Sequence, residues 1–288
     1  NILCELSKAG LFGMNPAPYA EPDVFIRLAK VPAELEGAGY QDSILSVADG
    51  SLLLDIKGVA RYLIRDGREI IIDICPNAEE GDVATFAFGS ALGTLLYQRG
   101  ILALHGSAVR TSKGAVIFSG EKGAGKSTLA SALCVRGWEF MSDDVCAVHL
   151  ENGTPVLYPG LSRAKLANDS YSQIYGHSPE ELPISPILKK YGASFAVSPD
   201  PCPLYAICNL ETAQGSPGIE LINGIDRLSA LVRQVYRPLI HSLLEQPLER
   251  FKQYTLAASS ALAYRVYRPS DFSQMNSFLA MLEDTLLY

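Results

Sequence analysis

The chain contains 288 residues, 48% of them hydrophobic and 19% charged, and its formal net charge is -7 at pH 7. This composition predicts a globular protein, and the length fits one large domain or two small ones. An acidic chain is a poor candidate for nucleic-acid binding, because such proteins concentrate Lys and Arg on one face. The longest uncharged apolar stretch, residues 83–97, is shorter than the roughly 18 residues that a membrane span needs. We therefore expect neither a nucleic-acid nor a membrane partner.

Six cysteines are scattered along the chain without C-x-x-C spacing: Cys4, Cys75, Cys134, Cys146, Cys202 and Cys208. No basic, apolar leader segment precedes them in this sequence. They are therefore expected to be reduced thiols that pack inside a cytoplasmic protein.

Short runs of β-forming residues dominate the first quarter of the chain. They cover residues 24–30, 51–57, 60–66 and 69–75, with Asp-Gly turn signals at 49–50 and 66–67. An apolar segment over 84–99 follows, which Glu80 to Asp82 can cap as a helix and Gly100 can end. The sequence thus predicts a small antiparallel, β-rich N-terminal section over residues 1–100 that ends in a buried helix.

The second part of the chain, residues 101–288, alternates between strand and helix patterns. Predicted strands cover 101–109 and 115–120, and the second leads into a glycine-rich loop and a helix over 127–136. A strand over 138–142 then presents Asp143 and Asp144 at its end, before a hairpin of strands over 145–150 and 154–159. This order of elements predicts an α/β fold.

The remainder of the chain has a weaker pattern. Residues 168–203 are rich in Pro and Ser and are expected to form loops with short helices. The later predictions are a strand over 204–211, a loop over 212–218, a helix over 226–244 with a break at Pro238, a strand over 261–269, and a final helix over 272–287 capped by Ser270-Asp271.

The glycine-rich loop matches the pattern G-x-x-x-x-G-K-[ST] in full. It reads Gly120, Glu121, Lys122, Gly123, Ala124, Gly125, Lys126, Ser127, and Thr128 follows it. Between a strand and a helix, such a loop turns its backbone N–H groups toward phosphate oxygens, while the lysine neutralises the β- and γ-phosphates. The hydroxyl of Ser127 is then a ligand for Mg²⁺. The pattern predicts binding of ATP with magnesium.

A nucleotide site of this kind also needs a carboxylate at the end of a neighbouring strand. Asp143 and Asp144 occupy that place, so that one can orient the metal while the other accepts a proton from an attacking hydroxyl. The competing interpretation is an acidic turn that opens the hairpin. His105, at the end of the preceding strand, fits either a place near the phosphates or a hydrogen-bonded place in the core.

The run LHGSAVRTSKGAVIFSGEKGAGKSTLASALCVRGWEFMSDDVCAV, residues 104–148, resembles the catalytic core of the HPr kinase/phosphorylase family. A His-Gly strand, a P-loop and an Asp-Asp pair follow in the same order with similar spacing. The resemblance implies a P-loop kinase core of the HPr kinase/PEP carboxykinase type that uses ATP and Mg²⁺. It also implies that Asp143 is the general base, that Asp144 assists the metal, and that His105 lies close to the base.

Two departures change the expected substrate. Thr128 stands where the bacterial HPr enzymes usually have Glu, and YPGLSRAKL (158–166) replaces their downstream Glu- and Arg-bearing signature. With LVRQVYRP (231–238) and YRVYRP (264–269), the layout looks more like the HPr kinase-like enzymes of lasso-peptide gene clusters. That resemblance implies phosphorylation of the C-terminal serine of a precursor peptide. HPr kinases are hexamers, so a homo-oligomer is a further expectation.

Several basic residues complete the candidate site. Arg163 and Lys165 can bind the transferred phosphoryl group or a substrate carboxylate, or else be solvated loop charges. Arg233 and Arg237 lie on a predicted helix, where most arginines face water, although the family pattern favours them as substrate contacts. The Lys189-Lys190 pair is interpreted as a solvated charge pair, with contact to an acidic partner as the alternative.

Two other functions fit the same motifs. A small-molecule kinase that acts on free serine or a sugar requires the same nucleotide core. A nucleotide-sensing module binds ATP through the loop without phosphoryl transfer, although the intact Asp pair argues against it. The preferred hypothesis is an ATP-dependent peptide-serine kinase.

Overall fold

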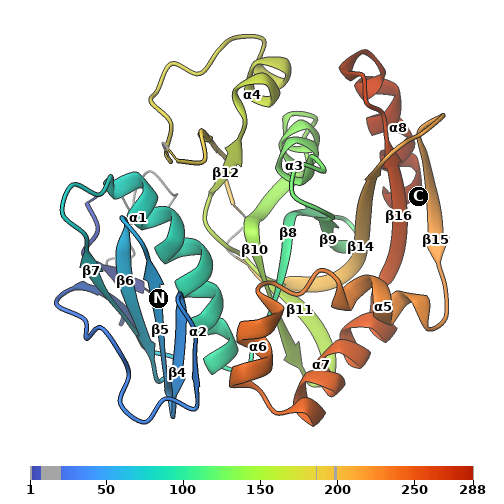
Figure 1. Cartoon of the computed structure of the whole chain (residues 1–288). Helices are drawn as coiled ribbons and strands as arrows, with labels where there is room; N and C mark the ends of the chain where they lie inside the picture. Colours follow the sequence, from blue (N-terminus) through green and yellow to red (C-terminus); the bar gives the residue numbers. More distant parts are fainter. Residues whose placement is uncertain (1, 8–20, 186, 198–199, 288) are drawn as a thin grey trace.

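The computed structural model describes residues 2–7, 21–185, 187–197 and 200–287. Within these ranges the chain forms two seven-stranded sheets and a two-stranded ladder, with helices between and around them (Figure 1). No described helix has both the length and the apolar character needed to cross a membrane. The six cysteines are all free thiols.

The N-terminal sheet has the strand order β1-β2-β7-β6-β5-β4-β3. Its strands are β1 (Ile2–Cys4), β2 (Val24–Leu28), β3 (Tyr40–Gln41), β4 (Leu45–Ala48), β5 (Ser51–Ile56), β6 (Ala60–Arg65) and β7 (Glu69–Ile74). The four predicted strands are confirmed as β2, β5, β6 and β7. The prediction of an antiparallel section is wrong in part, because β2 pairs in parallel with both β1 and β7. The chain leaves β2 and builds four strands before β7 returns beside it.

A long helix closes this section, made of α1 (Glu80–Phe86), the π-helical segment η2 (Ala87–Ala91) and α2 (Leu92–Gln98). It lies between the two sheets (Figure 1) and is buried on most of its surface. The helix is therefore confirmed, but the expected side-chain cap is not, because Glu79 at the N-cap makes no side-chain cap bond.

The second sheet has the order β11-β10-β8-β9-β14-β16-β15. Its strands are β8 (Leu102–Thr111), β9 (Gly114–Ser119), β10 (Glu139–Glu151), β11 (Thr154–Tyr158), β14 (Cys202–Thr212), β15 (Gly218–Ile222) and β16 (Leu262–Arg268). β9, β14 and β16 run parallel, and the outer pairs are antiparallel. β11 matches the strand predicted over 154–159. β15, which follows the predicted loop over 212–218, was not expected.

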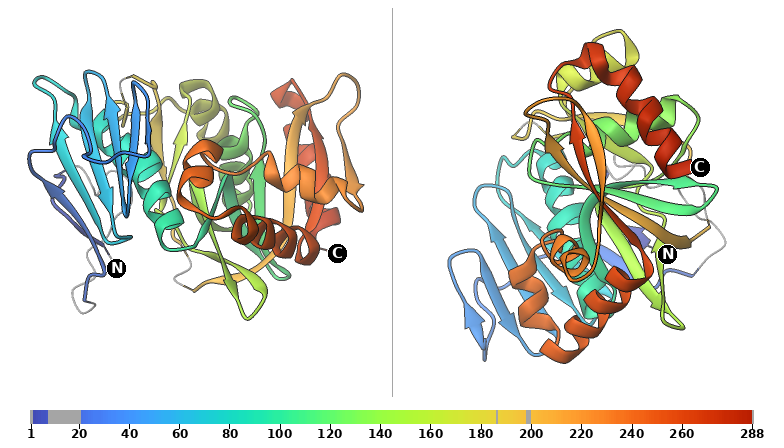
Figure 2. Two further views of the ribbon diagram at one scale, coloured as in Figure 1. Left: turned by 60° about the horizontal axis from the view of Figure 1, so that its bottom comes forward. Right: turned by 90° about the vertical axis from the view of Figure 1, so that its right-hand side faces the viewer.

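Helices cover both faces of this second sheet (Figure 2). One face carries α3 (Lys126–Val135) and α8 (Met275–Leu287), which share an apolar core with β9, β14 and β16. The other carries α5 (Asp226–Val232), α6 (Pro238–Leu244) and α7 (Pro247–Ser260), whose core continues into the N-terminal sheet. Because this apolar core is continuous, the boundary predicted at residue 100 stays a prediction.

The prediction that a strand ends at Asp143-Asp144 is wrong, because β10 continues beyond both residues. It runs unbroken through the pair, and β8 pairs with it from Glu139 opposite Arg110 to Val148 opposite Leu102. Nine residues of β8, from Leu102 to Arg110, pair with β10 along this stretch, with an irregularity between Phe140 and Ser142, so the ladder continues past the two carboxylates. Asp144 adopts a φ of 73° inside the strand, which is unusual for a residue other than glycine.

The irregular middle segment contains more order than expected. It holds α4 (Asn168–Tyr175) and β13 (Tyr191–Ser194), and β13 pairs with β12 (Arg163–Leu166). The predicted helix over 226–244 is interrupted at 233–237, where Val235 bridges Leu104 of β8 and Pro238 begins α6. The final helix is preceded by a short 3₁₀ turn, η3 (Phe272–Gln274), which Asp271 caps through the backbone N–H of Ser273.

A buried histidine connects the two halves of the core. His241 of α6 is 1% exposed, and its ring stacks on Tyr97 of α2 with centroids 4.1 Å apart. The Tyr254 hydroxyl of α7 bonds to its Nδ1 at 2.9 Å. Burial, aided by the charge of Arg250, lowers the pKa of His241 from 6.5 to about 4. The ring is therefore neutral in the folded protein at neutral pH.

We expect the free energy of unfolding to fall as the pH falls from about 6.5 to about 4. Between these values the unfolded chain binds a proton at His241 that the folded chain does not, so about 3 kcal/mol is lost. Denaturant titrations across this range measure the slope. His241→Gln should remove it, whereas His149→Gln, at a half-exposed histidine, should leave it in place. An equal slope in both variants contradicts the assignment.

Candidate functional site

The glycine-rich loop joins β9 to α3, in the strand–loop–helix context that the motif requires. Gly120, Gly123 and Gly125 have φ values of 140°, 87° and 92°, which side chains other than glycine rarely adopt. A Cβ on Gly120 would lie 2.7 Å from the carbonyl oxygen of Leu210 in β14. The loop conformation therefore depends on glycine, and its backbone N–H groups precede a ten-residue helix whose N-terminus favours anions.

The side chain of Lys126 folds back toward the start of the P-loop. Its Nζ donates to the carbonyl oxygens of Gly120 at 2.9 Å and Glu121 at 3.0 Å, and the residue is 8% exposed. Burial lowers its pKa, while the carboxylates of Asp143 and Asp144 oppose that change. Among the described residues its only hydrogen-bond partners are neutral carbonyl groups, so its positive charge is available for an anionic ligand.

Two later segments hold the loop from outside. The backbone N–H of Gly120 donates to Oε1 of Gln234 at 3.1 Å, and Nε of Arg268 donates to the carbonyl oxygen of Ala124 at 2.6 Å. Both partners come from the motifs LVRQVYRP and YRVYRP, although neither residue was predicted as part of the site. Both side chains therefore fix the position of the loop.

The carboxylate of Asp143 accepts hydrogen bonds from three different elements. Its Oδ1 accepts from the hydroxyls of Ser127 in α3 at 2.7 Å and Ser107 in β8 at 2.5 Å. Its Oδ2 accepts from the backbone N–H of Lys165 in β12 at 2.9 Å. The predicted neighbourhood of the P-loop and the Asp pair is therefore present, with Asp143 as the residue in contact.

Asp144 faces a different environment. Its Oδ2 accepts from Nζ of Lys165 at 2.6 Å, and Nδ1 of His105 lies 3.4 Å from its Oδ1 and 3.1 Å from its carbonyl oxygen. Burial raises the pKa of Asp144, but Lys165 and His105 outweigh that effect and hold it well below its usual range. His105 is thus in contact with Asp144 rather than with Asp143, near which it was predicted.

The N-terminal helix forms one wall beside the Asp pair. A Cβ on Gly89 in η2 would lie 3.1 Å from the Tyr236 hydroxyl and 3.5 Å from Oδ2 of Asp144. Ser90, the next residue, accepts a hydrogen bond from Arg237 at 3.0 Å. Sequence reasoning missed this wall, although the glycines inside an apolar helix were a signal of close approach. π-Helical segments are rare and often mark functional sites.

The other residues predicted for the site, Arg163, Thr128 and Arg233, have partners or surroundings outside the Asp pair. Arg163 pairs with Glu181 at 2.6 Å and donates to the carbonyl oxygen of Gly192. Thr128 donates to the Ser170 hydroxyl of α4 at 3.0 Å. Arg233 is exposed where α5 ends. Lys165 and Arg237 are therefore the predicted cations that adjoin the Asp pair or its wall.

Oxygen ligands for a hard cation are present beside the loop. Among the described residues no three His, Cys, Asp or Glu side chains gather as a metal cluster. Ser127 and Asp143 nevertheless place a hydroxyl and a carboxylate oxygen 2.7 Å apart at the N-terminus of α3. Mg²⁺ is commonly held by one or two such groups together with substrate phosphates, so the residues fit magnesium bound with a nucleotide.

Comparison with known proteins finds similarity among solved structures alone. No family model matches the chain, and no curated protein matches it. Among solved structures, the Hpr(Ser) kinase/phosphatase from Coxiella burnetii matches 64% of this chain and 95% of its own, with 15% sequence identity and a TM-score of 0.34. That TM-score is too low to establish a common fold, so function must rest on this chain's own geometry.

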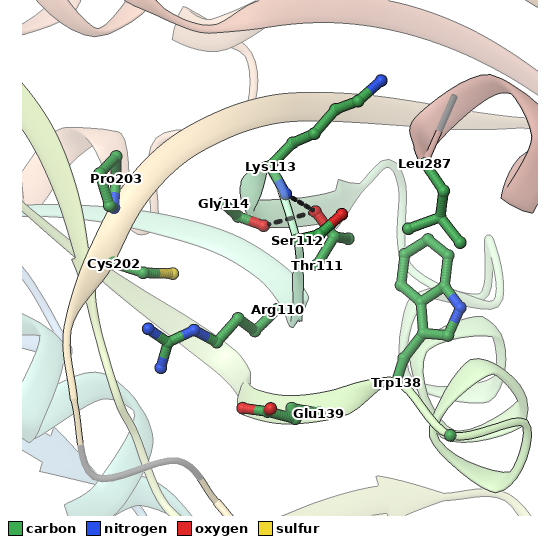
Figure 3. A pocket seen from close by; sticks show the side chains of 11 residues that line it. Arg110, Thr111, Ser112, Lys113, Gly114, Trp138, Glu139, Cys202, Pro203 and Leu287 are labelled. Carbon is green, nitrogen blue, oxygen red and sulfur yellow. Dashed lines mark hydrogen bonds between the residues drawn. The ribbon is translucent and has the colours of Figure 1, made fainter.

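A separate cavity of about 810 Å³ lies at the opposite end of β8 and β9 from the P-loop (Figure 3). It is lined by the β8–β9 turn, including Thr111 and Lys113, and by Trp138 and Leu287. The Thr111 hydroxyl stabilises this turn by accepting from the N–H of Lys113 and donating to the carbonyl oxygen of Gly114. The cavity shares no lining residue with the P-loop or the Asp pair.

Removing the cation partner of Asp144 should destabilise the fold. Lys165→Met leaves a largely buried carboxylate without its ion pair, which costs about 3 kcal/mol. Urea denaturation at pH 7 measures the loss. The double variant Asp144→Asn with Lys165→Met should recover part of it, because no unpaired charge remains. A double variant as unstable as the single one would contradict this account.

Gly106, between His105 and Ser107, should not tolerate a side chain. A Cβ there would lie 2.6 Å from Cγ2 of Ile117 and 2.8 Å from the carbonyl oxygen of Phe118. Because β8 and β9 are packed together, Gly106→Ala should cost about 1–3 kcal/mol. Gly39→Ala, where a Cβ meets no atom within 4 Å, is the matched control and should change stability little. Thermal unfolding of both variants tests the contrast.

Proposed function

We propose that this chain is an ATP-dependent kinase that phosphorylates a serine hydroxyl, with a P-loop kinase core of the HPr kinase/PEP carboxykinase type. The main support for this proposal is the hydrogen bond between Ser127 and Asp143, which places a carboxylate beside the P-loop. Phosphoryl transfer depends mainly on positioning and on neutralisation of phosphate charge. This site contains residues that could meet both requirements.

The loop and its lysine would hold the triphosphate. The backbone N–H groups after Gly120 and the N-terminus of α3 favour phosphate oxygens, and Lys126 supplies a buried positive charge. Ser127 and a carboxylate of the Asp pair would hold Mg²⁺. When bound, the metal would neutralise charge on the β- and γ-phosphate oxygens.

Asp143 is the better general base of the two carboxylates. Its hydrogen-bond donors are two hydroxyls and a backbone N–H, whereas Asp144 bonds to the ammonium of Lys165, which lowers its basicity. In the proposed step the serine oxygen bonds to the γ-phosphorus, and the bond to the β–γ bridging oxygen breaks. ADP leaves, and the serine proton passes to Asp143. Assistance to the metal by Asp144 remains a prediction.

The proposed acceptor is the C-terminal serine of a lasso-peptide precursor. Support comes from the sequence resemblance over residues 158–166, 231–238 and 264–269. Two residues of those motifs, Gln234 and Arg268, hold the P-loop in this chain. Free serine or a sugar is the alternative acceptor, since the nucleotide core would be the same.

Mass spectrometry after incubation with Mg·ATP and a precursor peptide ending in serine should show one added phosphate. Asp143→Asn should lower kcat about a hundredfold or more, because a general base contributes at least that much, and should leave ATP affinity within a few-fold. Asp284→Asn, at an exposed position of α8, is the matched control.

The same experiment separates the alternatives. Phosphorylation of free serine or a sugar but not of the peptide would support the small-molecule kinase. Tight ATP binding without transfer to any hydroxyl would support the sensing module and overturn the kinase proposal. Full activity in Asp143→Asn would overturn the assignment of the base.

A further inference from the structure

Between α4 and β13, two backbone hydrogen bonds join Ile184 and Ser185 to Lys190 and form a loop next to the β12–β13 ladder. The N–H of Ile184 donates to the carbonyl oxygen of Lys190 at 2.8 Å, and the N–H of Lys190 donates to that of Ser185 at 3.4 Å. Strand β13 begins at the next residue, Tyr191, which pairs with Leu166 of β12. Lys190 therefore lies at the start of the ladder whose other strand carries Lys165.

A carboxylate of the N-terminal section anchors this loop. Oδ1 of Asp82 in α1 accepts from the Ser185 hydroxyl at 2.6 Å and from the N–H of Ile187 at 3.2 Å. The Ser185 hydroxyl also accepts from the N–H of Leu188 at 3.2 Å. Asp82 is 3% exposed and Ser185 is fully buried. In the described part of the chain Asp82 forms no ion pair, so its bonds to the loop satisfy the buried carboxyl group.

The loop brings Lys190 into the electrostatic environment of the P-loop and the Asp pair. Lys190 is half-buried; burial lowers its pKa, and the carboxylate of Asp143 opposes that change. Within the described ranges it forms no ion pair. A half-buried ammonium without a counter-ion is costly unless an anionic ligand joins it. This placement corrects the expectation of a solvated Lys189-Lys190 pair, since Lys189 alone is exposed.

We propose that Lys190 binds the γ-phosphate of the nucleotide and that Asp82 is the positioning residue that holds its loop in place. The inference rests on the proposed kinase function for the identity of the ligand. Lys165 is already neutralised by Asp144, and Lys126, the first residue of α3, bonds to carbonyl oxygens of the P-loop itself. Lys190 supplies the additional cation that a triphosphate, but not a diphosphate, requires beside Asp143.

The experiment compares the affinities of the purified full chain for ADP and for a non-hydrolysable ATP analogue, both with Mg²⁺, by calorimetry. Lys190→Met should weaken binding of the ATP analogue about tenfold or more, the usual effect of losing a hydrogen bond to a charged group, and change ADP binding less than about twofold. Lys189→Met, one residue away and exposed, is the matched control and should behave as wild type.

The role of Asp82 is tested by the same ratio of affinities. Asp82→Ala should lose the preference for the ATP analogue as Lys190→Met does, and the double variant should lose no more than either single one. Asp82→Asn keeps an oxygen acceptor for Ser185 and Ile187, so it should retain the preference. Thermal unfolding of each variant separates loss of positioning from loss of the fold.

The outcomes distinguish this inference from the proposed function. Equal weakening of ADP and the ATP analogue in Lys190→Met overturns γ-phosphate binding. A changed KM for the peptide with an unchanged ratio of nucleotide affinities also overturns it, and would assign Lys190 to the acceptor. If wild type prefers the ATP analogue through Lys190 but phosphorylates no hydroxyl, the kinase proposal fails while the phosphate contact stands.

Discussion

The contact between the Asp143 carboxylate and the Ser127 hydroxyl is the constraint on which the rest of the site depends. It requires that β10 pair with β8, that β8 pair with β9, and that β9 lead into the P-loop. In this register Asp143 lies opposite Ser107, which bonds to the same oxygen. A slip of one residue would turn Asp143 to the other face of the sheet. The alignment of three strands therefore sets the chemistry.

Two adjacent carboxylates of the same strand have different surroundings. Asp144 has a φ of 73°, and its side chain meets Lys165 and His105 instead of the P-loop hydroxyls. A buried cation keeps Asp144 ionised, while Asp143 faces hydroxyl groups that a substrate and a metal could replace. Neighbouring titratable groups with different environments are a common basis for separate acid, base and metal roles.

The N-terminal section is part of the site rather than an independent attachment. Asp82 holds the loop that carries Lys190, and the close approach at Gly89 brings Tyr236 against the helix beside Asp144. The apolar core runs without interruption from the first sheet to α7. A chain cut near residue 100 would therefore expose this core and remove one wall of the site.

The sequence by itself determined the P-loop, its flanking strand and helix, most of the N-terminal strands and the final helix. These features are local, since glycine spacing, apolar periodicity and turn residues act over a few positions. The tertiary structure alone decided that β10 continues through the Asp pair, that Lys165 neutralises Asp144, and that Arg163 pairs with Glu181. These outcomes depend on residues that are distant in the sequence. Arg163 and Glu181 are 18 positions apart, and His105 and Asp144, on paired strands, are 39 positions apart. No local pattern encodes such distances, because the energy of a buried charge depends on which side chains the fold brings to it.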